Sequence, residues 1–529
     1  MLLERSRYKA PMPAKAAEGW SLSRLTPPSR LNSANGIRTG ADGRLYVAQV
    51  AGSLVSAIDV DSGDIETISP MGALVGPDDL CFDDAGNLYV TEITKGRVSM
   101  RKPNGETRVV YGDVPVANPI TFHQGRLITG ELRIGGRIME LDRNGGAPRV
   151  IFEGVPMCNA FDVGPDGKLY FPAQYANEIW RVSLDGGAPE VVAKDLGVPD
   201  SVKFHPDGYI VSTQVASGQV LKIDPRTGAS EVLADIGPGL DNVAFVNGRT
   251  FVSHITGSIH EILAPGKIRA LVDRGFEWPM GVGVNSDGVV YAADGMFAYA
   301  VKPGAGAALA GTLFWPGYPG FMRGVAVDSA GAWIVSTAMG TVARWVPGQD
   351  HEMLASGFQI PMGVALAPGG AVVLADAGAG RVVSVDGGAV TELAHGLDEP
   401  YGVAVSADGV VYVSLPNQGA IAKITAGKAE TFADGLGRPE GICVQGGKLY
   451  AVDTVGKTVL ECDLASGARR VLADNLAVGA PLGIAPLKLG GVGDMCGPMW
   501  TFTGIAIGGD GTLYISADGE GSVLALRPA

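Results

Sequence analysis

The sequence predicts an all-β protein made of two tandem six-bladed β-propellers with four-stranded antiparallel blades. Two observations carry this prediction. A hairpin-like unit recurs twelve times, at intervals of 39 to 43 residues except for the last interval, which is longer. Glycine makes up 78 of the 529 residues, about twice its usual share of roughly 7%, which suits many short strands joined by tight turns. Four strands in a repeat of about 40 residues are typical of a propeller blade.

The clearest copy of the unit runs from Val198 to Gln214. It holds a short apolar run, a polar turn that ends in Gly208, and a second apolar run. Alternation with period two around an Asp-Gly turn is the pattern of a β-hairpin. Two further strands, at 219–224 and 229–233, precede the next copy. Each unit therefore predicts one blade.

The first strands of the twelve units begin near Asn35, Asp78, Asn118, Asn159, Asp200, Asp241, Met280, Arg323, Met362, Tyr401, Glu440 and Thr503. Twelve blades in one ring would be very wide, so we expect two rings of six blades. Two rings that share the blades differently are the alternative.

The ends of the chain suggest how the rings close. We expect an N-terminal extension at 1–18, a first propeller at 19–265 and a second at 266–529, with the boundary at the Pro-Gly turn of Ala264–Lys267. Trp20–Leu25 would complete the sixth blade and Ile268–Asp273 the twelfth, which removes exposed sheet edges. The apolar loop at 482–500 is expected to pack on a propeller face or in the seam between the rings, or to act as a substrate lid.

Composition and charge exclude some classes of binding partner. The formal charge of −14 comes without a basic cluster, which argues against nucleic acid and anionic membranes as partners. No apolar run approaches the roughly 20 residues that span a bilayer, and no signal peptide is visible, so we expect a cytoplasmic protein. The cysteines lack CxxC spacing and are expected to be free thiols: Cys81, Cys158, Cys443, Cys462 and Cys496.

The residue that opens each first strand should face its counterparts around the central channel. In the first ring all six are Asn or Asp: Asn35, Asp78, Asn118, Asn159, Asp200 and Asp241. Three convergent carboxylates resist joint ionisation, and a hard cation with oxygen ligands would compensate them. The sequence therefore predicts a divalent metal site, with Ca²⁺ favoured and Mg²⁺, Mn²⁺ or Zn²⁺ as alternatives. A water-filled polar plug, or Asx residues that merely form turns, is the other interpretation.

The second ring differs at the same register, with Met280, Arg323, Met362, Tyr401, Glu440 and Thr503. This set cannot form an oxygen cage. We expect a plugged channel, or a site for an apolar or anionic group anchored by Arg323. The chemistry is therefore placed in the first ring.

Polar residues also end the second strands of the first ring, at Gln49, Glu92, Glu131, Gln174, Gln214 and His254. We expect them to form an outer polar circle above the metal. His254 is a candidate proton carrier, and Glu92 and Glu131 are candidates for orienting water or supporting the metal ligands. The alternative is that each is a solvated rim residue.

The repeats, such as Gly86–Glu92 and Gly167–Phe171, resemble over essentially the whole chain the calcium-dependent six-bladed propellers that include the gluconolactonase/senescence-marker-protein family, diisopropylfluorophosphatase and paraoxonase. In gluconolactonase-like enzymes the metal is held by a glutamate from the first blade, asparagines from the third and fourth, and an aspartate from the fifth. Asn118, Asn159 and Asp200 match the last three. Asn35 departs from the expected glutamate, and the duplicated ring is a second departure.

The resemblance implies hydrolysis of a lactone or related ester, in which Asp200, or water activated by Asp200 or His254, attacks a carbonyl polarised by the cation. No GxSxG elbow is evident. The substrate would be a small molecule, larger or more apolar than a sugar lactone. Two alternatives stay open: a metal-assisted lyase or isomerase of the virginiamycin-B-lyase type that needs His254 as its base, and a non-catalytic binding scaffold.

Overall fold

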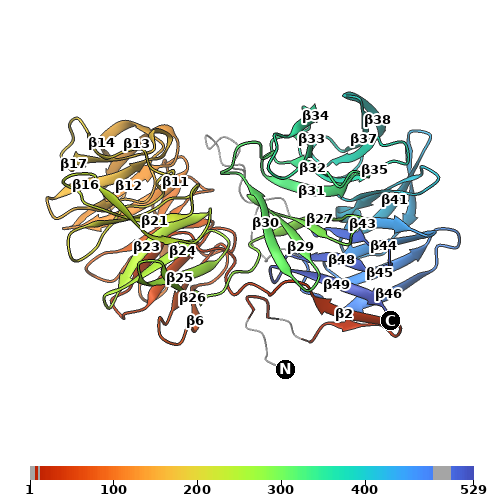
Figure 1. The fold of residues 1–529 in the computed structure, drawn as a ribbon, viewed down its shortest axis with the longest axis horizontal. Coiled ribbons are helices and arrows are strands. Elements are labelled where there is room, and N and C mark those ends of the chain that lie inside the picture. Colours follow the sequence, from red (N-terminus) through yellow and green to blue (C-terminus); the bar gives the residue numbers. More distant parts are fainter. Residues whose placement is uncertain (1–5, 10–11, 480–501) are drawn as a thin grey trace. The chain divides into compact units, whose positions relative to one another are not determined.

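The computed structural model describes residues 6–9, 12–479 and 502–529, and it confirms the all-β propeller architecture (Figure 1). Twelve antiparallel sheets contain all the strands, and eleven of them have four strands. The described residues contain no α-helix; two short 3₁₀ turns, η1 (Gln174–Ala176) and η2 (Pro416–Gln418), interrupt the strand pattern.

The first propeller comprises six sheets, each made of four strands that are consecutive in the chain. Their bounds are β3 (Ile37–Thr39), β4 (Leu45–Gln49), β5 (Leu54–Ile58), β6 (Ile65–Ser69); β7 (Pro77–Phe82), β8 (Leu88–Glu92), β9 (Arg97–Arg101), β10 (Thr107–Tyr111); β11 (Ala117–His123), β12 (Arg126–Glu131), β13 (Ile134–Leu141), β14 (Arg149–Pro156); β15 (Asp162–Val163), β16 (Lys168–Ala173), β17 (Glu178–Ser183), β18 (Glu190–Ala193); β19 (Lys203–Phe204), β20 (Ile210–Thr213), β21 (Gln219–Ile223), β22 (Ser230–Asp235); and β23 (Leu240–Val246), β24 (Arg249–His254), β25 (Ser258–Ala264), β26 (Lys267–Val272).

Hydroxyl side chains from the second strands connect neighbouring blades of this ring. Thr91 Oγ1 donates to the carbonyl of Asn118 in the next blade at 2.7 Å. Ser253 Oγ of the sixth blade donates to the carbonyl of Asn35 in the first at 2.6 Å. Strand β23 also contacts β3 directly. The ring is therefore closed between its last and first blades.

The second propeller also has six sheets. Its strands are β27 (Pro279–Val284), β28 (Val290–Asp294), β29 (Phe297–Lys302), β30 (Gly306–Thr312); β31 (Met322–Val327), β32 (Trp333–Thr337), β33 (Thr341–Trp345), β34 (Glu352–Ser356); β35 (Pro361–Leu366), β36 (Val372–Asp376), β37 (Arg381–Asp386), β38 (Ala389–His395); β39 (Val403–Val405), β40 (Val411–Leu415), β41 (Ala420–Thr425), β42 (Lys428–Ala433); β43 (Pro439–Gln445), β44 (Lys448–Asp453), β45 (Thr458–Asp463), β46 (Arg469–Asp474), extended by β1 (Lys15–Ala16); and β47 (Ile505–Ile507), β48 (Leu513–Ala517), β49 (Ser522–Pro528), completed by β2 (Trp20–Arg24).

The predicted exchange of closing strands is wrong. Strand β2 pairs with β49, with Trp20 opposite Pro528 and Arg24 opposite Leu524, so the N-terminal strand completes the twelfth blade. Strand β26 pairs with β25 and completes the sixth. The reason is local: β25 and β26 are joined by a short turn in which Gly266 has φ +71°, and such a hairpin forms at a small loop-closure cost.

The two propellers are also the two compact units of the chain. One unit spans Arg30–Arg274, and the other combines the described parts of residues 1–29, 275–481 and 500–529. The first propeller is thus inserted into the sequence of the second. The turn at Ala264–Lys267, expected to be the boundary, lies between two strands of one sheet, and the loop at 482–500 lies outside the described residues.

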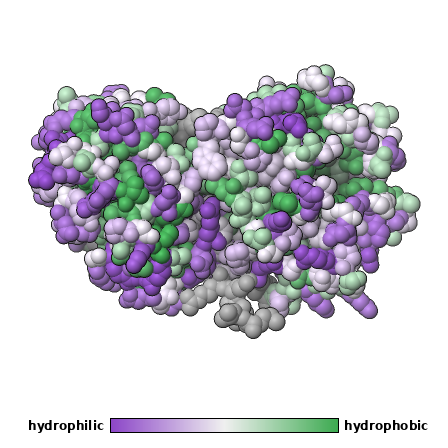
Figure 2. Space-filling model, viewed as in Figure 1, coloured by the Kyte–Doolittle hydropathy of each residue, from purple (hydrophilic) through white to green (hydrophobic). Residues whose placement is uncertain are grey.

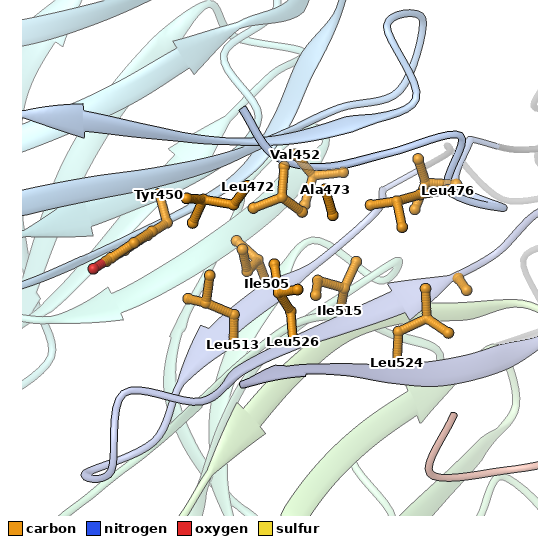
Figure 3. Packing of buried hydrophobic residues seen from close by; sticks show 13 residues of the cluster. Tyr450, Val452, Leu472, Ala473, Leu476, Ile505, Leu513, Ile515, Leu524 and Leu526 are labelled. Carbon is orange, nitrogen blue, oxygen red and sulfur yellow. The ribbon is translucent and has the colours of Figure 1, made fainter. Parts of the chain in front are cut away.

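Apolar packing between neighbouring blades forms the core. Figure 3 shows one such layer in the second propeller, where Val452 and Leu472 of one sheet face Ile515 and Leu526 of the next. Trp20 and Leu22 of β2 pack against this cluster, which explains how a strand so remote in sequence is held. Hydrophilic side chains cover much of the face shown in Figure 2.

Cys81, Cys158 and Cys462 are buried free thiols and Cys443 is a half-buried one; Cys496 lies outside the described residues. None of the helices in the described part of the chain has the length and apolar character to cross a membrane.

Candidate functional site

The six Asn and Asp side chains of the first ring are all buried, with exposed fractions between 4% and 9%. The pairing of first and second strands is irregular where several of them lie, between Pro77 and Leu80 in the second blade and between Leu240 and Val243 in the sixth. Such bulges release a residue from the ladder and redirect its side chain. The backbone therefore presents these residues separately from the regular sheet.

A left-handed residue stands two positions before five of the six ring members. Two of these are glycines, but Val116, Met157 and Val198 adopt φ values of +52°, +64° and +65°. Such conformations cost about 1–3 kcal/mol each and gather at functional sites. Among the described equivalents in the second propeller, only Glu399 has this conformation. The sequence could not signal the feature, because Val and Met disfavour it.

The carboxyl groups of the ring share hydrogen bonds with its amides. Asn35 Nδ2 donates to Asp241 Oδ2 at 3.2 Å. Asp200 Oδ1 accepts from Asn159 Nδ2 and, at 2.9 Å, from Gln174 Nε2. The amide oxygens of Asn35 and Asn159 instead accept backbone N–H groups. These two amides therefore present their nitrogen atoms to the carboxylates.

Burial raises the pKa of all three ring carboxyl groups. The pKa of Asp78 is raised by burial and then by the charges of Asp241 and Asp79, and that of Asp200 by burial and then by Asp241 and Asp78. Burial, followed by the charge of Asp79, raises the pKa of Asp241 to about 8. The ring thus disfavours the negative charge that its three carboxylates would carry together.

The donor set suits a hard cation only as a mixture of carboxylate and amide oxygens. Asn118 Oδ1 is buried without a hydrogen-bond partner. No group of three or more His, Cys, Asp or Glu side chains in the described residues is placed to hold a metal ion, so carboxylates alone do not suffice. A cation in this arrangement could take the oxygen of Asn118 with at most two of the carboxylates of Asp78, Asp200 and Asp241.

Two basic residues that the sequence analysis did not single out, Arg38 and Lys203, stand three positions after the ring members Asn35 and Asp200. Arg38 donates to the carbonyls of Leu80 and Ile120, both at 3.0 Å. Lys203 Nζ donates to the carbonyl of Phe161 at 3.0 Å, and burial, with the nearby Arg38 charge, lowers its pKa to about 8. Both residues donate to carbonyls of neighbouring blades, and Arg38 also lies 3.9 Å from Asp79, beside the ring member Asp78; neither forms a described ion pair with Asp78, Asp200 or Asp241.

Glu92 and Glu131 are each bound by arginine side chains of their own blades. Glu92 forms a two-pronged ion pair with Arg97 at 2.9 and 2.7 Å and accepts the backbone N–H of Val75 at 2.8 Å. Glu131 accepts from the side chains of Arg133 and Arg137, which outweigh burial and lower its pKa. Both carboxylates hold their own blades together, because the end of a second strand lies beside the segment that enters or leaves the blade.

His254 is likewise engaged through both ring nitrogens. Its Nε2 lies 2.8 Å from the carbonyl of Pro238, and its Nδ1 accepts the backbone N–H of Thr256 at 3.2 Å. A carbonyl can only accept, so Nε2 carries the proton. Burial lowers the pKa of His254 well below its usual range. Both ring nitrogens of this candidate proton carrier thus have protein partners.

All six residues of the outer polar circle are buried, so the circle is not a solvated rim. We call its members clamps where the side chain accepts a backbone N–H group, as Glu92 does from Val75. Gln49 Oε1 accepts the N–H of Asn32 at 2.8 Å, and Gln214 Oε1 accepts that of Gly197 at 3.0 Å. Gln174 is the exception, because its amide reaches Asp200 in the ring.

The ring positions of the second propeller carry buried side chains. Glu440 accepts from Arg438 Nε and Thr454 Oγ1, each at 3.2 Å, and from the N–H of Thr503 at 2.8 Å. Tyr401 accepts from Arg438 Nη2 at 3.2 Å. Met280 and Met362 are fully buried. Arg323, the expected anchor of an apolar or anionic group, is buried as well, and its Nη1 donates to the carbonyl of Pro361 at 3.5 Å.

Replacing Glu92 by Ala is expected to destabilise the protein by roughly 2–4 kcal/mol, because the substitution leaves Arg97 and the N–H of Val75 without their buried partner. Turnover per folded molecule should stay unchanged. Glu106→Ala, which breaks an exposed pair with Lys102 in the same blade, is the control and should alter stability little. Urea unfolding measures both variants, and a stable Glu92→Ala protein that has lost turnover would restore its catalytic role.

No family model matches the chain, and no curated protein matches it. Solved structures resemble it. A streptogramin B lyase is 18% identical, covering 52% of this chain and 94% of its own. The calcium-binding protein regucalcin from Agrobacterium tumefaciens is 16% identical, covering 47% and 96%. A gluconolactonase from Xanthomonas campestris is 14% identical, covering 47% and 94%. Each has a TM-score of 0.38.

Proposed function

We propose that the protein is a divalent-cation-dependent hydrolase of a lactone or related ester, with its active site at the channel ring of the first propeller. One observation carries the proposal: three buried carboxyl groups, Asp78, Asp200 and Asp241, lie close enough to repel one another, and none of them forms an ion pair with a described basic side chain. Asn118, at the same register, has a buried oxygen without a hydrogen-bond partner. A scaffold gains nothing from such a costly arrangement.

The cation would be held by Asp200, by one of Asp78 and Asp241, and by the amide oxygen of Asn118, with Ca²⁺ as the favoured ion. When bound, it would polarise the substrate carbonyl and stabilise the negative charge that develops on its oxygen. Bound positive charge would also lower the pKa of the three carboxyl groups and keep them ionised at neutral pH.

Asp200 is the base in this proposal. Its Oδ1 accepts two hydrogen bonds from Asn159 and Gln174, and no described residue donates to Oδ2. Oδ2 would take a proton from the attacking water as the water oxygen bonds to the carbonyl carbon. The bond to the alkoxy oxygen then breaks, and Asp200 returns the proton to that oxygen. One water is consumed for each ester bond.

The two alternatives fare differently. The lyase alternative required His254 as an obligatory base, and both ring nitrogens of His254 have other partners. The scaffold alternative leaves the convergent carboxyl groups without a purpose, and it is kept as an outcome of the test.

The test begins with metal analysis of the purified protein by plasma mass spectrometry, before and after chelation. A panel of lactones and esters is then assayed with and without added Ca²⁺. We expect about one equivalent of divalent ion, loss of turnover on chelation, and products heavier than substrate by one water. Products of unchanged total mass would establish elimination instead. Absence of a bound ion at millimolar Ca²⁺ would overturn the proposal in favour of the scaffold.

A further inference from the structure

We propose that Gln174 is a positioning residue for the ring, holding the Asp200 carboxylate so that one oxygen stays available to a cation and to water. This inference rests on the function proposed above. It assigns a role to a side chain that the sequence pattern grouped with the outer clamps.

Gln174 differs from those clamps in how the first and second strands of its blade are paired. Glu92 pairs with Pro77, and Gln214 pairs with Pro199, directly before the ring residue. In the fourth blade the partner of Cys158 is Ala173, so Ala173 holds the clamp position. Gln174 therefore stands one residue further along the chain.

The residues at this further position share a backbone contact. In four other blades the N–H of this residue donates to the carbonyl of the residue two positions before the ring member, at 2.9–3.1 Å. The donor and acceptor pairs are Ile93 and Gly76, Leu132 and Val116, Val215 and Val198, and Ile255 and Gly239. Gln174 donates in the same way to Met157 at 3.1 Å. With Val50 in the first blade, five of the six positions are aliphatic, and Gln174 is the polar exception.

The 3₁₀ turn η1 explains why the fourth blade differs. It spans Gln174–Ala176 and is capped by Asn177, which is left-handed with φ +54°. The Asn177 side chain accepts the N–H of Val198 at 3.1 Å, and its carbonyl accepts that of Leu196 at 3.1 Å. Asn177 thus ties the turn to the segment that leads into Asp200, and it fixes Gln174 beside its target.

Gln174 acts on one oxygen only. Its Nε2 lies 2.9 Å from Asp200 Oδ1, the same atom that accepts from Asn159. Two donors on one oxygen hold the carboxylate plane in a single orientation and leave Oδ2 to other ligands. Gln174 is itself buried at 7% exposure, so its geometry is constrained by packing. Partners of this kind beside metal ligands are worth about 10–100-fold in metal affinity.

Gln174→Met tests the role, since methionine keeps the length and removes the donor. Gln214→Met is the matched control, because Gln214 bonds Gly197 and Ser212 but not the ring. Ca²⁺ affinity is measured by calorimetry on chelated protein, with turnover followed against Ca²⁺ concentration. We expect Gln174→Met to bind Ca²⁺ about 10-fold more weakly and to regain turnover at saturating Ca²⁺. Gln214→Met should bind Ca²⁺ as the natural protein does.

Equal Ca²⁺ affinity in Gln174→Met and the natural protein would overturn the inference and leave the proposed function intact. An equal loss in both glutamine variants would also overturn it, since the cause would then be general loosening of the blades. A natural protein that binds no divalent ion would overturn both the inference and the proposed function.

Discussion

Replacing Asp200 by Asn is expected to lower cation-dependent hydrolysis by about 10³-fold. Asparagine keeps the shape and can still accept from Asn159 and Gln174 at its amide oxygen, but it cannot take a proton from water. Loss of a general base costs about 10²–10⁴-fold in rate. The variant also removes one of three mutually repelling buried charges, so the chelated protein should be no less stable than the natural one. Steady-state kinetics and thermal unfolding measure the two effects.

Glu440→Gln is the matched control for Asp200→Asn. Glu440 occupies the equivalent register in the second propeller, where its carboxylate is fully hydrogen-bonded by neighbours. We expect its hydrolysis rate to stay within about two-fold of the natural protein, since general-base effects are confined to groups that touch the substrate. If Asp200→Asn retained full turnover, the base would have to lie elsewhere and the proposed mechanism would be wrong.

The chelated protein is expected to lose stability as the pH rises from about 4 to about 8. Burial raises the pKa of Asp241 to about 8, above its value of roughly 3.9 in the unfolded chain. Between these values the native state binds more protons than the unfolded state, so the free energy of unfolding falls with rising pH. Each pKa unit corresponds to about 1.4 kcal/mol, so the shift of about four units is worth at most roughly 5–6 kcal/mol. Half of this, about 3 kcal/mol, would lower the melting temperature by roughly 6–12 °C.

Calcium should abolish much of that pH dependence, because a bound cation keeps the ring carboxylates ionised and compensated. In the second propeller, burial and the Glu440 charge raise the pKa of Asp518 to about 7. Asp518 therefore also makes the free energy of unfolding fall as the pH rises, and calcium should not change this contribution. Melting temperatures at pH 5, 6, 7 and 8, with and without calcium, separate the two. Asp241→Asn should flatten the calcium-sensitive part, and a calcium-sensitive part that persists unchanged in this variant would exclude Asp241 as its source.

The sequence by itself determined the architecture of the blades and the composition of the ring. Alternating apolar residues and Gly-containing turns act over a few residues, so twelve hairpins and their spacing could be read directly. The ring could be read as well, because its members recur at one register of that repeat, from Asn35 to Asp241. Both features follow from local periodicity, which survives without knowledge of distant contacts.

Only the tertiary structure decided how the repeats are joined and what their polar residues do. Pairing of Trp20 with Pro528 joins residues about 500 positions apart, and no local pattern distinguishes that partner from the other blade. Glu92, Glu131 and His254 have the residue types of catalysts, yet neighbours brought in by folding occupy their polar atoms. Gln174 is the reverse case. The sequence pattern grouped it with the outer polar circle, but the 3₁₀ turn η1 places its amide within hydrogen-bonding distance of Asp200 in the ring. Side-chain chemistry is a property of the residue, but availability depends on which partners the fold places within hydrogen-bonding distance.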